Sequence, residues 1–468
     1  MTETSSGPEE VDLLVIGGGK AGKTLAVARA KAGERVAMVE RGMIGGSCIN
    51  VACIPTKTLV TSARALATFA RAEKLGIRSS SAAVDLALLR AHKEGVVGDM
   101  VDMHRTLFAG SGMDFILGSA RFTGPRTVEV ATDAGGTRTL RGRRVVLNTG
   151  TRPSIPRIPG LSREQLKTSE DMLRLEGIPE RLVVVGGGYV GCEFAQMFAR
   201  FGSAVTMIVR GPRLLAREEP EVSEAIERAF AEDGITVLHD AAIEHGRAVS
   251  GGLALTLSTG GELRADAVLV AVGREPVTDG LDVQLAGVEL DERGYVVVDD
   301  ELRTSADRVW AVGDVAGHPQ FTHVSYDDFR IVQQNLDLAS DSPGHASTRG
   351  RLVPSVVFVE PEIANVGLSE AEAREAGHDV VVASQPVLAV PRSRTLRQTD
   401  GFWKIVIDRD STRILGATLV GADSAEVLSV IQTAMLADAP YTLLRDAIFA
   451  HPAMAEGLAT AFANVKFR

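Results

Sequence analysis

Two glycine-rich turns, each lying between a strand-like run and a helical run, constrain this chain more than any other feature of its sequence. The first begins with the apolar run Val11–Ile16, enters Gly17-Gly18-Gly19-Lys20-Ala21-Gly22 and continues into a helical pattern. A second apolar run, Arg35–Val39, then ends at Glu40. Strand, glycine turn, helix, strand and acid in this order are typical of a βαβ unit that binds a dinucleotide.

Each glycine of that unit, and the acid at its end, has a physical reason. Gly17 permits the tight turn, and Gly19 lets the backbone approach a pyrophosphate at the helix N-terminus. Gly22 allows the helix to pack closely on the strand. The carboxylate of Glu40 would accept hydrogen bonds from an adenosine ribose.

The same pattern returns where Leu182–Val185 leads into Gly186-Gly187-Gly188-Tyr189-Val190-Gly191 and a helical run, Cys192–Met197. A single glycine fingerprint is weak evidence, because glycine-rich turns are common after buried strands. Two fingerprints in full βαβ context are strong evidence. Gly186, Gly188 and Gly191 are therefore expected to contact a second dinucleotide, and the simplest pair is a flavin and a nicotinamide.

Three further strand-like runs end in short polar loops. In open α/β sheets, ligands bind beyond the carboxyl ends of the strands, so these loops are expected to line the cofactor sites. The runs and their loops are Arg144–Asn148 with Thr149-Gly150, Ala267–Val272 with Gly273-Arg274, and Val309–Val312 with Gly313-Asp314.

A length of 468 residues corresponds to about three domains. We expect a discontinuous first domain at residues 1–155 and 285–346, a second at 156–284 and a third at 347–468. Residues 58–75 and 85–109 read as long amphipathic helices, separated by a break at Ser79-Ser80-Ser81-Ala82. The third domain has no fingerprint and alternates strand-like runs such as Ser355–Phe358 with helices.

Charge and cysteine content exclude several classes of protein. The chain has 50 Lys+Arg against 60 Asp+Glu, a net charge of −10, which gives no global field for a nucleic acid. Three cysteines are too few for a disulfide-stapled secreted scaffold. Met1–Glu10 lacks the pattern of a signal peptide and no apolar run is long enough to span a bilayer, so we expect a cytoplasmic protein.

Cys48 and Cys53 lie in Gly45-Gly46-Ser47-Cys48-Ile49-Asn50-Val51-Ala52-Cys53-Ile54-Pro55-Thr56-Lys57, shortly after Glu40. They could be two small buried hydrophobes or half of a zinc site, although no second Cys/His cluster accompanies them. Their position favours redox chemistry, because the segment opens a helix beside the first cofactor. A helix N-terminus and Lys57 would both lower a thiol pKa there. Cys192 is read as a packing residue.

These features together resemble the flavoprotein disulfide reductase family, whose members include lipoamide dehydrogenase, glutathione reductase and mercuric reductase. The resemblance covers essentially the whole chain and includes His451-Pro452 and Glu456 near its end. Within the family, residues 19–26, 53–60 and 325–332 are similar to the bacterial reactive-chlorine-resistance reductases. The implied fold is α/β, with two Rossmann-like domains for FAD and NAD(P) and a C-terminal α+β dimerisation domain.

The resemblance also implies roles for individual residues. Cys53 would be the flavin-proximal thiolate and Cys48 the thiol that meets the substrate. Lys57 would lie near the flavin, paired with Glu193, and Asp314 would bind the ribityl chain or flavin tail. Tyr189 would act as a lid over the flavin, with an ordinary buried aromatic as the alternative.

His451 and Glu456 would form an acid–base pair contributed across a two-fold homodimer. An imidazole oriented by a carboxylate can move a proton at neutral pH, which thiol exchange requires. The alternative is a histidine that caps a helix. Ala453 and Ala455 depart from the hydroxyl residues usual in the family.

The acceptor of the electrons is left open. The chain ends Asn464–Arg468 without the cysteine pair typical of mercuric reductases, so ordinary mercuric ion reduction is not expected. A disulfide or a soft metal ion such as Cu(II) or Hg(II) remains possible for a reduced dithiol. Lipoamide dehydrogenase activity within a 2-oxo acid dehydrogenase complex is the alternative, and a non-catalytic flavin sensor is a third reading.

The preference between the two nicotinamides is read from the end of the second βαβ unit. An acid there would hold the NAD ribose, but Val209 takes that position and Arg210 and Arg213 follow. Two arginines favour the NADP 2′-phosphate. We therefore expect a homodimeric, FAD-dependent oxidoreductase that uses NAD(P)H, with NADPH preferred, and that has neither a resident metal nor a nucleic-acid or membrane partner.

Overall fold

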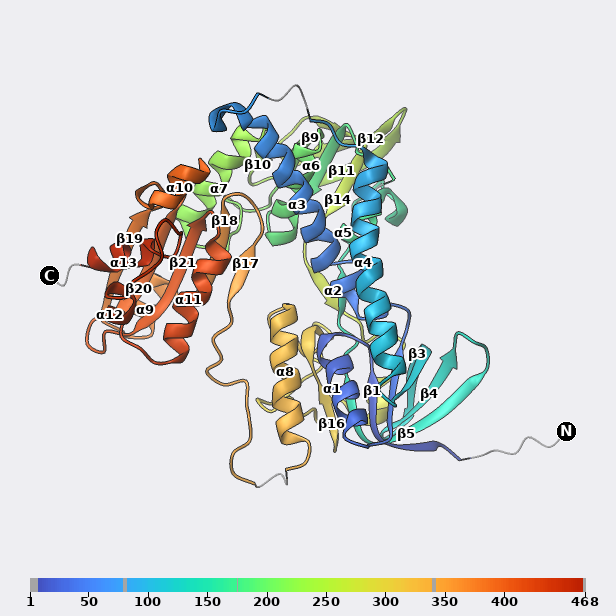
Figure 1. Cartoon of the computed structure of the whole chain (residues 1–468). Coiled ribbons are helices and arrows are strands. Elements are labelled where there is room, and N and C mark those ends of the chain that lie inside the picture. Colours follow the sequence, from blue (N-terminus) through green and yellow to red (C-terminus); the bar gives the residue numbers. More distant parts are fainter. Residues whose placement is uncertain (1–6, 79–81, 175, 339–341, 466–468) are drawn as a thin grey trace. The chain divides into compact units, whose positions relative to one another are not determined.

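A computed structural model describes residues 7–78, 82–174, 176–338 and 342–465 (Figure 1). The chain divides into two compact units. The first unit consists of Met1–Thr58, Arg90–Ser154 and Gly273–Arg351, and the second of Leu59–Leu89, Ile155–Val272 and Leu352–Arg468. Of the predicted break at Ser79-Ser80-Ser81-Ala82, the three serines lie outside the described residues, as do the last three residues of the chain.

The first unit is built on one sheet whose central strands are parallel. β1 pairs with β2 on one side and with β5 on the other, and β16 extends the sheet beyond β5. The long strands β3 and β5 continue into an antiparallel meander with β4. The strands are β1 (Glu9–Ile16), β2 (Val36–Glu40), β3 (Asp114–Gly124), β4 (Thr127–Thr132), β5 (Thr137–Leu147), β6 (Thr151–Pro153), β15 (Arg274–Pro276) and β16 (Val309–Ala311).

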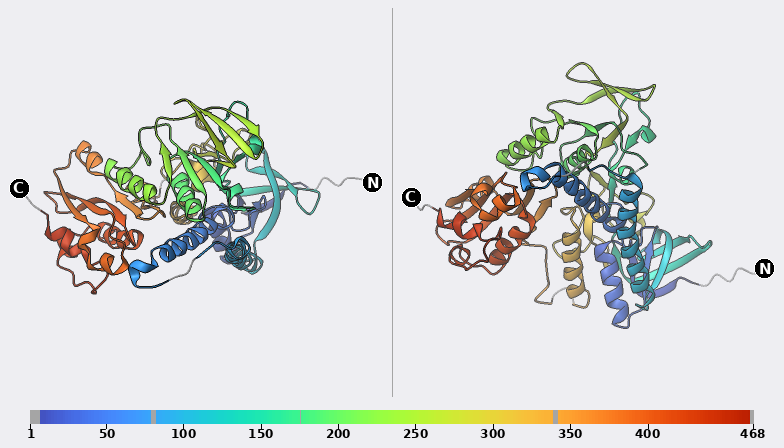
Figure 2. Two further views of the ribbon diagram at one scale, coloured as in Figure 1. Left: turned by 90° about the horizontal axis from the view of Figure 1, so that it is seen from above. Right: turned by 45° about the horizontal axis from the view of Figure 1, so that its top comes forward.

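Helices α1 and α8 lie side by side against this sheet (Figures 1 and 2). Leu13, Val15 and Met38 point into the core that the two helices cover, whereas Leu14, Ile16 and Val39 lie in the core of the opposite face. The strands are therefore apolar on both faces, as expected for a parallel sheet covered on both sides. The helices of this unit, two of which continue into the second unit, are α1 (Lys20–Lys31), α2 (Ser47–Asn50), α3 (Cys53–Ala70), α4 (Leu86–Ala109) and α8 (Thr322–Asn335).

Helix α3 begins at Cys53, five residues before the helix that the sequence pattern predicts. Pro55 is its third residue. A proline in the first turn removes no helical hydrogen bond, because the first four N–H groups of a helix have no partner within it. The Cys53–Lys57 segment is thus part of the helix itself.

The second unit contains a parallel sheet in the order β10-β9-β8-β14-β7 and an antiparallel sheet in the order β17-β18-β21-β20-β19, which is orange to red in Figure 2. A small antiparallel sheet of β11, β12 and β13 accompanies the parallel one. The strands are β7 (Leu166–Lys167), β8 (Arg181–Val185), β9 (Ala204–Ile208), β10 (Thr236–Leu238), β11 (Ile243–Val249), β12 (Gly252–Leu257), β13 (Glu262–Ala265), β14 (Ala267–Val270), β17 (Ser355–Val357), β18 (Glu362–Gly367), β19 (Val380–Pro386), β20 (Phe402–Asp408) and β21 (Ile414–Gly421).

The helices of the second unit cover these sheets, and α11 packs on β18 and β21. They are α5 (Ser169–Met172), α6 (Tyr189–Arg200), α7 (Pro220–Glu232), α9 (Glu370–Glu375), α10 (Pro391–Leu396), α11 (Ser424–Leu436), α12 (Thr442–Arg445) and α13 (Gly457–Ala463). Two parallel α/β sheets and a C-terminal antiparallel sheet with helices confirm the predicted fold class. None of the described helices combines the length and apolarity that crossing a bilayer requires.

The return of the chain to the first unit occurs at Gly273. β15 pairs with β6, and Leu281, Val283 and Val288 join the core of the first unit. Most of the predicted second domain and the predicted third domain fall in one compact unit. The predicted limits at residues 155, 284 and 346 therefore stay a prediction.

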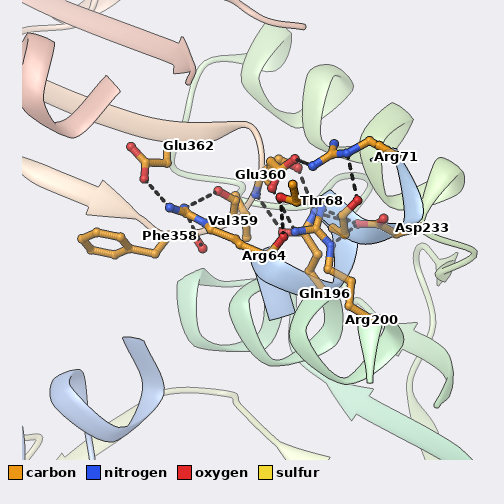
Figure 3. A network of polar contacts seen from close by, with 11 residues as sticks. Arg64, Thr68, Arg71, Gln196, Arg200, Asp233, Phe358, Val359, Glu360 and Glu362 are labelled. Atoms are coloured by element: carbon orange, nitrogen blue, oxygen red, sulfur yellow. Dashed lines mark hydrogen bonds and ion pairs between the residues drawn. The ribbon is translucent and has the colours of Figure 1, made fainter. Parts of the chain in front are cut away.

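An ion-pair network holds helices and a loop of the second unit together (Figure 3). Glu360 accepts hydrogen bonds from Arg71, the residue directly after α3, and from Arg200 on α6. Gln196 makes two further bonds with the Glu360 backbone, accepting from its N–H at 2.7 Å and donating to its carbonyl at 2.8 Å. Arg64 donates to Glu362 at 2.8 Å. Each of the three carboxylates, Glu360, Glu362 and Asp233, thus forms an ion pair with at least one arginine.

The packing of α1 on its strand predicts the effect of one added methyl group. A Cβ at Gly22 would lie 2.7 Å from the Gly17 carbonyl oxygen and 2.9 Å from a methyl group of Val15, whereas a Cβ at Gly95 on α4 would meet nothing within 4 Å. Gly22→Ala should destabilise the protein by about 1–3 kcal/mol, and Gly95→Ala should stabilise it by about 0.5–1 kcal/mol. Thermal denaturation of both variants measures this difference, and equal melting temperatures would contradict the tight packing.

Candidate active site

The first fingerprint turn is shaped by contact with the end of β5. Gly17 has φ +99°, and a Cβ there would lie 2.3 Å from the Asn148 carbonyl oxygen, so only glycine fits. The Asn148 side chain accepts from the N–H of Gly22 at 2.9 Å and donates to the Val312 carbonyl at 2.8 Å. Asn148 thereby fixes the start of α1 between β5 and β16.

The turn fits the pyrophosphate and ribose of a dinucleotide. The N–H groups of Gly19 and Lys20 have no acceptor among the described residues, and α1 has no side-chain cap. Free N–H groups at the N-terminus of a 12-residue helix are the donors that a pyrophosphate needs. The Glu40 carboxylate ends β2 and accepts from the Gly18 N–H at 2.7 Å, so it lies against the same turn. The residues present therefore fit an FAD adenosine diphosphate moiety.

The other strand ends of the first unit come together as the sequence predicts. Thr149 and Gly150 follow β5, and the next residue, Thr151, donates to the Asp314 carboxylate at 2.9 Å. Arg274, next to Gly273, donates to the Thr151 hydroxyl at 2.8 Å. Burial raises the pKa of Asp314, while the Thr151 hydrogen bond opposes that shift.

Gly313 lies close to the start of α8. Its N–H donates at 2.7 Å to Asp328, which is fully buried and paired with Arg351 at 2.7 Å. Burial alone would raise the pKa of Asp328, but the nearby His318 imidazole and hydrogen bonds from Arg351 and the Gly313 N–H lower it. The loop that carries Asp314 is thus held in place by a charged residue that the sequence analysis did not single out.

Cys48 and Cys53 lie beside each other in the first unit, on α2 and at the first residue of α3. Both are thiols in this structure. Hydrogen bonding to Cys53 and burial raise the pKa of the Cys48 thiol. The Cys48 sulfur therefore keeps its proton and donates a hydrogen bond to the Cys53 sulfur. The N-terminus of α3 favours negative charge at the Cys53 sulfur. Lys57 lies one helical turn further along α3.

Thr322, the first residue of α8, is a contact that sequence reasoning missed. Its hydroxyl lies 3.5 Å from the Cys53 sulfur. Its hydrogen bonding to Cys48 lowers the pKa of the Cys48 thiol, although Cys53 and burial raise that pKa by more. Thr322 is separated from Cys53 by 269 positions in the sequence. No local pattern marks such a residue.

The second fingerprint repeats the geometry of the first in the second unit. Gly186 has φ +114°, and a Cβ there would lie 2.4 Å from the Ala271 carbonyl oxygen. A Cβ at Gly191 would lie 2.2 Å from the Gly186 carbonyl oxygen, which repeats the close approach of Gly22 to Gly17. Gly188 precedes α6, which has no side-chain cap. These features fit the pyrophosphate of a second dinucleotide.

The register of the two units identifies the position equivalent to Glu40. The Gly17 N–H donates to the Val39 carbonyl, and the Gly186 N–H donates to the Ile208 carbonyl. The residue after Ile208 is Val209, which is buried against Gly187. Arg210 follows, exposed and without a partner among the described residues, and Arg213 donates to the Ala216 carbonyl at 3.0 Å.

Tyr189 and Glu193 both lie on α6. The Tyr189 hydroxyl donates to Glu218, whose other oxygen accepts from Asn365 at 2.8 Å. Burial raises the pKa of Tyr189 and that of Glu218. Glu193 is buried and accepts from the Phe358 N–H at 2.9 Å. Its predicted pairing with Lys57 joins residues of different units and stays a prediction.

His451 and Glu456 form a pair within one chain. The His451 Nδ1 lies 2.8 Å from a Glu456 oxygen, and the imidazole is 70% exposed while the carboxylate is 18% exposed. An imidazole held at Nδ1 presents Nε2 outward. The third cysteine, Cys192, is fully buried, and burial raises the pKa of its thiol, as expected of a packing residue. In the described ranges, no group of three or more His, Cys, Asp or Glu side chains is arranged to hold a metal ion.

Comparison with known proteins matches this chain to one family over nearly its whole length. The profile of the pyridine nucleotide-disulphide oxidoreductases matches residues 11–328, and that of their dimerisation domain matches residues 353–462. The chain is 39% identical over 461 residues to the probable pyridine nucleotide-disulfide oxidoreductase RclA of Escherichia coli K12, covering 97% of this chain and 99% of the relative.

Other relatives are similar over comparable lengths. The chain is 37% identical over 454 residues to a mercuric reductase of Streptomyces lividans, covering 96% and 94% of the two chains. It is 35% identical over 465 residues to a dihydrolipoyl dehydrogenase of Haloferax volcanii, covering 97% and 96%.

A solved structure, the Cu(II) complex of the HOCl-induced flavoprotein disulfide reductase RclA from Escherichia coli, superimposes with a TM-score of 0.89 at 38% identity and covers 98% of this chain and 100% of its own. These matches explain the two fingerprints, the cysteine pair and the C-terminal sheet together. The chain belongs to the pyridine nucleotide-disulphide oxidoreductase family, as an oxidoreductase with a dimerisation domain, and membership of this family supports FAD and a pyridine nucleotide as its cofactors.

Proposed function

We propose that this protein takes electrons from NADPH, passes them through FAD to a Cys48–Cys53 disulfide and delivers them from the resulting dithiol to a thiol-reactive acceptor. One observation carries this proposal: the Cys48 side chain on α2 is hydrogen-bonded to that of Cys53, the first residue of α3, in the same unit as the first fingerprint. Two thiols in contact can close to a disulfide by giving up two electrons and two protons.

Bound FAD would supply two-electron transfer between the nicotinamide and the disulfide. The chain contributes binding and charge. The Gly19 and Lys20 N–H groups and Glu40 would hold the adenosine diphosphate end, and Asp314 would accept a hydroxyl hydrogen bond. Lys57 would add positive charge near Cys53, with Glu193 to orient it. Tyr189 would cover the flavin until the nicotinamide enters.

The reduced pair would then act on the acceptor through Cys48. For a disulfide acceptor, the Cys48 sulfur attacks one sulfur of the acceptor, and the second thiol resolves the mixed disulfide. The leaving thiolate needs a proton, which the exposed His451 imidazole, held by Glu456, would provide. We propose that this pair serves the site of the second chain in a homodimer.

A soft metal ion is the second acceptor class in this proposal. Reduction of two Cu(II) ions to Cu(I) would oxidise the dithiol to the disulfide and release two protons. The solved Cu(II) complex of a relative supports Cu(II) as a substrate to be tested. Dihydrolipoamide oxidation with NAD is the alternative, favoured by the Haloferax relative, and predicts co-purification with a 2-oxo acid dehydrogenase complex.

Anaerobic titration of the purified yellow protein tests the proposal. NADPH should produce long-wavelength thiolate–flavin charge-transfer absorbance, and Cys53→Ser should abolish it because that sulfur is the donor. Cys48→Ser should keep FAD bound but lose turnover of the acceptor. Rates with Cu(II), Hg(II), glutathione disulfide, lipoamide and quinones then identify the acceptor. Cys192→Ser is the matched control, and absence of the band in the wild-type protein would refute the dithiol route.

The Thr322 hydroxyl is expected to make the Cys48 sulfur more reactive. Thr322→Val keeps the shape of the side chain and removes a hydrogen bond that favours the thiolate, so the pKa of Cys48 should rise further. At pH 7 a smaller thiolate fraction should slow alkylation of the reduced protein by iodoacetamide by about threefold, equivalent to about half a pKa unit. Thr24→Val, which loses only a bond to the Lys20 carbonyl, is the control. Unchanged alkylation in Thr322→Val would contradict this role.

Arg210 is expected to recognise the 2′-phosphate of NADPH. Arg210→Ala should raise the KM for NADPH about tenfold, or about 1.4 kcal/mol, and leave the KM for NADH nearly unchanged, because only NADPH carries that phosphate. Steady-state kinetics with both nucleotides measure the difference. Arg228→Ala on α7 removes an equally exposed arginine as the control. A parallel rise for both nucleotides would show that Arg210 does not select between them.

A further inference from the structure

Helix α8 carries a fully buried carboxylate to which the proposed function gives no role. Asp328 has no exposed surface, and both of its oxygens accept hydrogen bonds. One oxygen accepts from the Gly313 N–H at 2.7 Å, and the other accepts from an Arg351 nitrogen at 2.7 Å. Replacing a buried ion pair by apolar side chains is often neutral for stability, so stability alone does not account for Asp328.

Three polar residues of α8, three positions apart, contact three different parts of the first unit. The Thr322 hydroxyl lies 3.5 Å from the Cys53 sulfur. The Ser325 hydroxyl accepts from the Ala21 N–H at 3.2 Å, in the first turn of α1. Asp328, one turn further, accepts from the loop that follows β16. Residues three apart are neighbours on a helix surface, so one side of α8 joins the cysteine, the fingerprint turn and this loop.

The loop after β16 packs tightly against α8. Gly313 has φ +70°, and a Cβ there would lie 2.8 Å from the Ser325 hydroxyl oxygen and 2.9 Å from the Asn148 side-chain nitrogen. The Gly313 N–H points at Asp328. Close packing and this hydrogen bond together fix the direction in which the chain enters the next residue, Asp314.

Asp314 has one oxygen to spare for a ligand. One of its oxygens accepts from the Thr151 hydroxyl at 2.9 Å, and the other has no donor among the described residues. A carboxylate oxygen accepts from hydroxyl groups, which the ribityl chain of FAD provides. A shift of the backbone at Gly313 would move this oxygen, although Asp328 itself need not touch the cofactor.

We propose that Asp328 is a positioning residue for FAD, which accepts from the Gly313 N–H and thereby sets the Asp314 carboxylate that would bind the ribityl chain. The inference rests on the proposed binding of FAD in the first unit. Arg351 neutralises the buried charge of Asp328, so that the carboxylate can remain an acceptor. Ser325 holds the fingerprint turn from the same helix, so α8 would fix two of the segments that hold FAD.

The affinity of the purified protein for FAD tests this proposal. Asp328→Ala removes the acceptor of the Gly313 N–H, and the Kd for FAD, measured by fluorescence of the FAD released from the holoprotein, should rise about tenfold. Asp327→Ala is the matched control, because Asp327 is the preceding residue of α8 and lies 3.6 Å from Arg351 without bonding to Gly313. Equal Kd values in Asp328→Ala and the wild-type protein would overturn the proposal.

The conservative variant separates positioning from a purely structural ion pair. Asparagine keeps an oxygen that can accept from the Gly313 N–H but has no charge for Arg351. Asp328→Asn should therefore bring the Kd for FAD back to within about threefold of the wild-type value, even where its melting temperature stays as low as that of Asp328→Ala. If Asp328→Asn loses FAD as readily as Asp328→Ala, the ion pair is what matters and the proposal is wrong.

Two further results keep the test decisive. If Asp328→Ala does not fold, the double variant Asp328→Leu with Arg351→Met replaces the pair by apolar side chains, and its Kd for FAD should also rise about tenfold. An unchanged Kd there would count against the proposal. A wild-type protein that binds no FAD would refute the proposed function itself, whereas full retention of FAD by Asp328→Ala would refute only the role of Asp328.

Discussion

The close approach of the first turn of α1 to the ends of β1 and β5 is the constraint on which the rest of the first unit depends. Gly17 and Gly22 have no side chain because the backbone and Asn148 occupy that space. The approach leaves the N–H groups of Gly19 and Lys20 without an acceptor in the described part of the chain. It also brings Gly46 against Gly19, where an added Cβ would lie 2.9 Å from the Gly19 Cα. The loop that carries Cys48 therefore lies against the turn that we propose to bind the first cofactor.

The two βαβ units have the same backbone but differ in chemistry at one position. Glu40 and Val209 follow equivalent carbonyl groups, yet one is a carboxylate and the other a buried hydrophobe. The backbone of both turns depends on glycines, because a Cβ at Gly17, Gly22, Gly186 or Gly191 would lie within 3 Å of a carbonyl oxygen. The residue after the second strand is free of that constraint, so it can set which dinucleotide binds.

Features that depend on neighbours in the sequence could be predicted, and those that depend on distant segments could not. Both fingerprints, the strand-end loops and the fold class follow from local patterns of glycine and apolar residues, whose spacing reflects the period of a strand or a helix. The apolar pattern of α3 starts only at residue 58, whereas the helix itself starts at Cys53, because its first turn tolerates Pro55. Thr322 reaches the cysteine region only through tertiary packing, which no spacing in the sequence records.

The Arg64–Arg71–Arg200 network of the second unit has a consequence for behaviour at high temperature. Its guanidinium groups share Glu360, Glu362 and Asp233, and Glu360 is held by both Arg71 and Arg200 (Figure 3). The cost of removing charges from water falls as temperature rises, while the stabilisation from apolar burial levels off. Helices α3 and α6 are thus joined to the Glu360 loop by contacts whose relative contribution grows with heat. Heating should loosen the apolar cores of this unit before it separates these three segments.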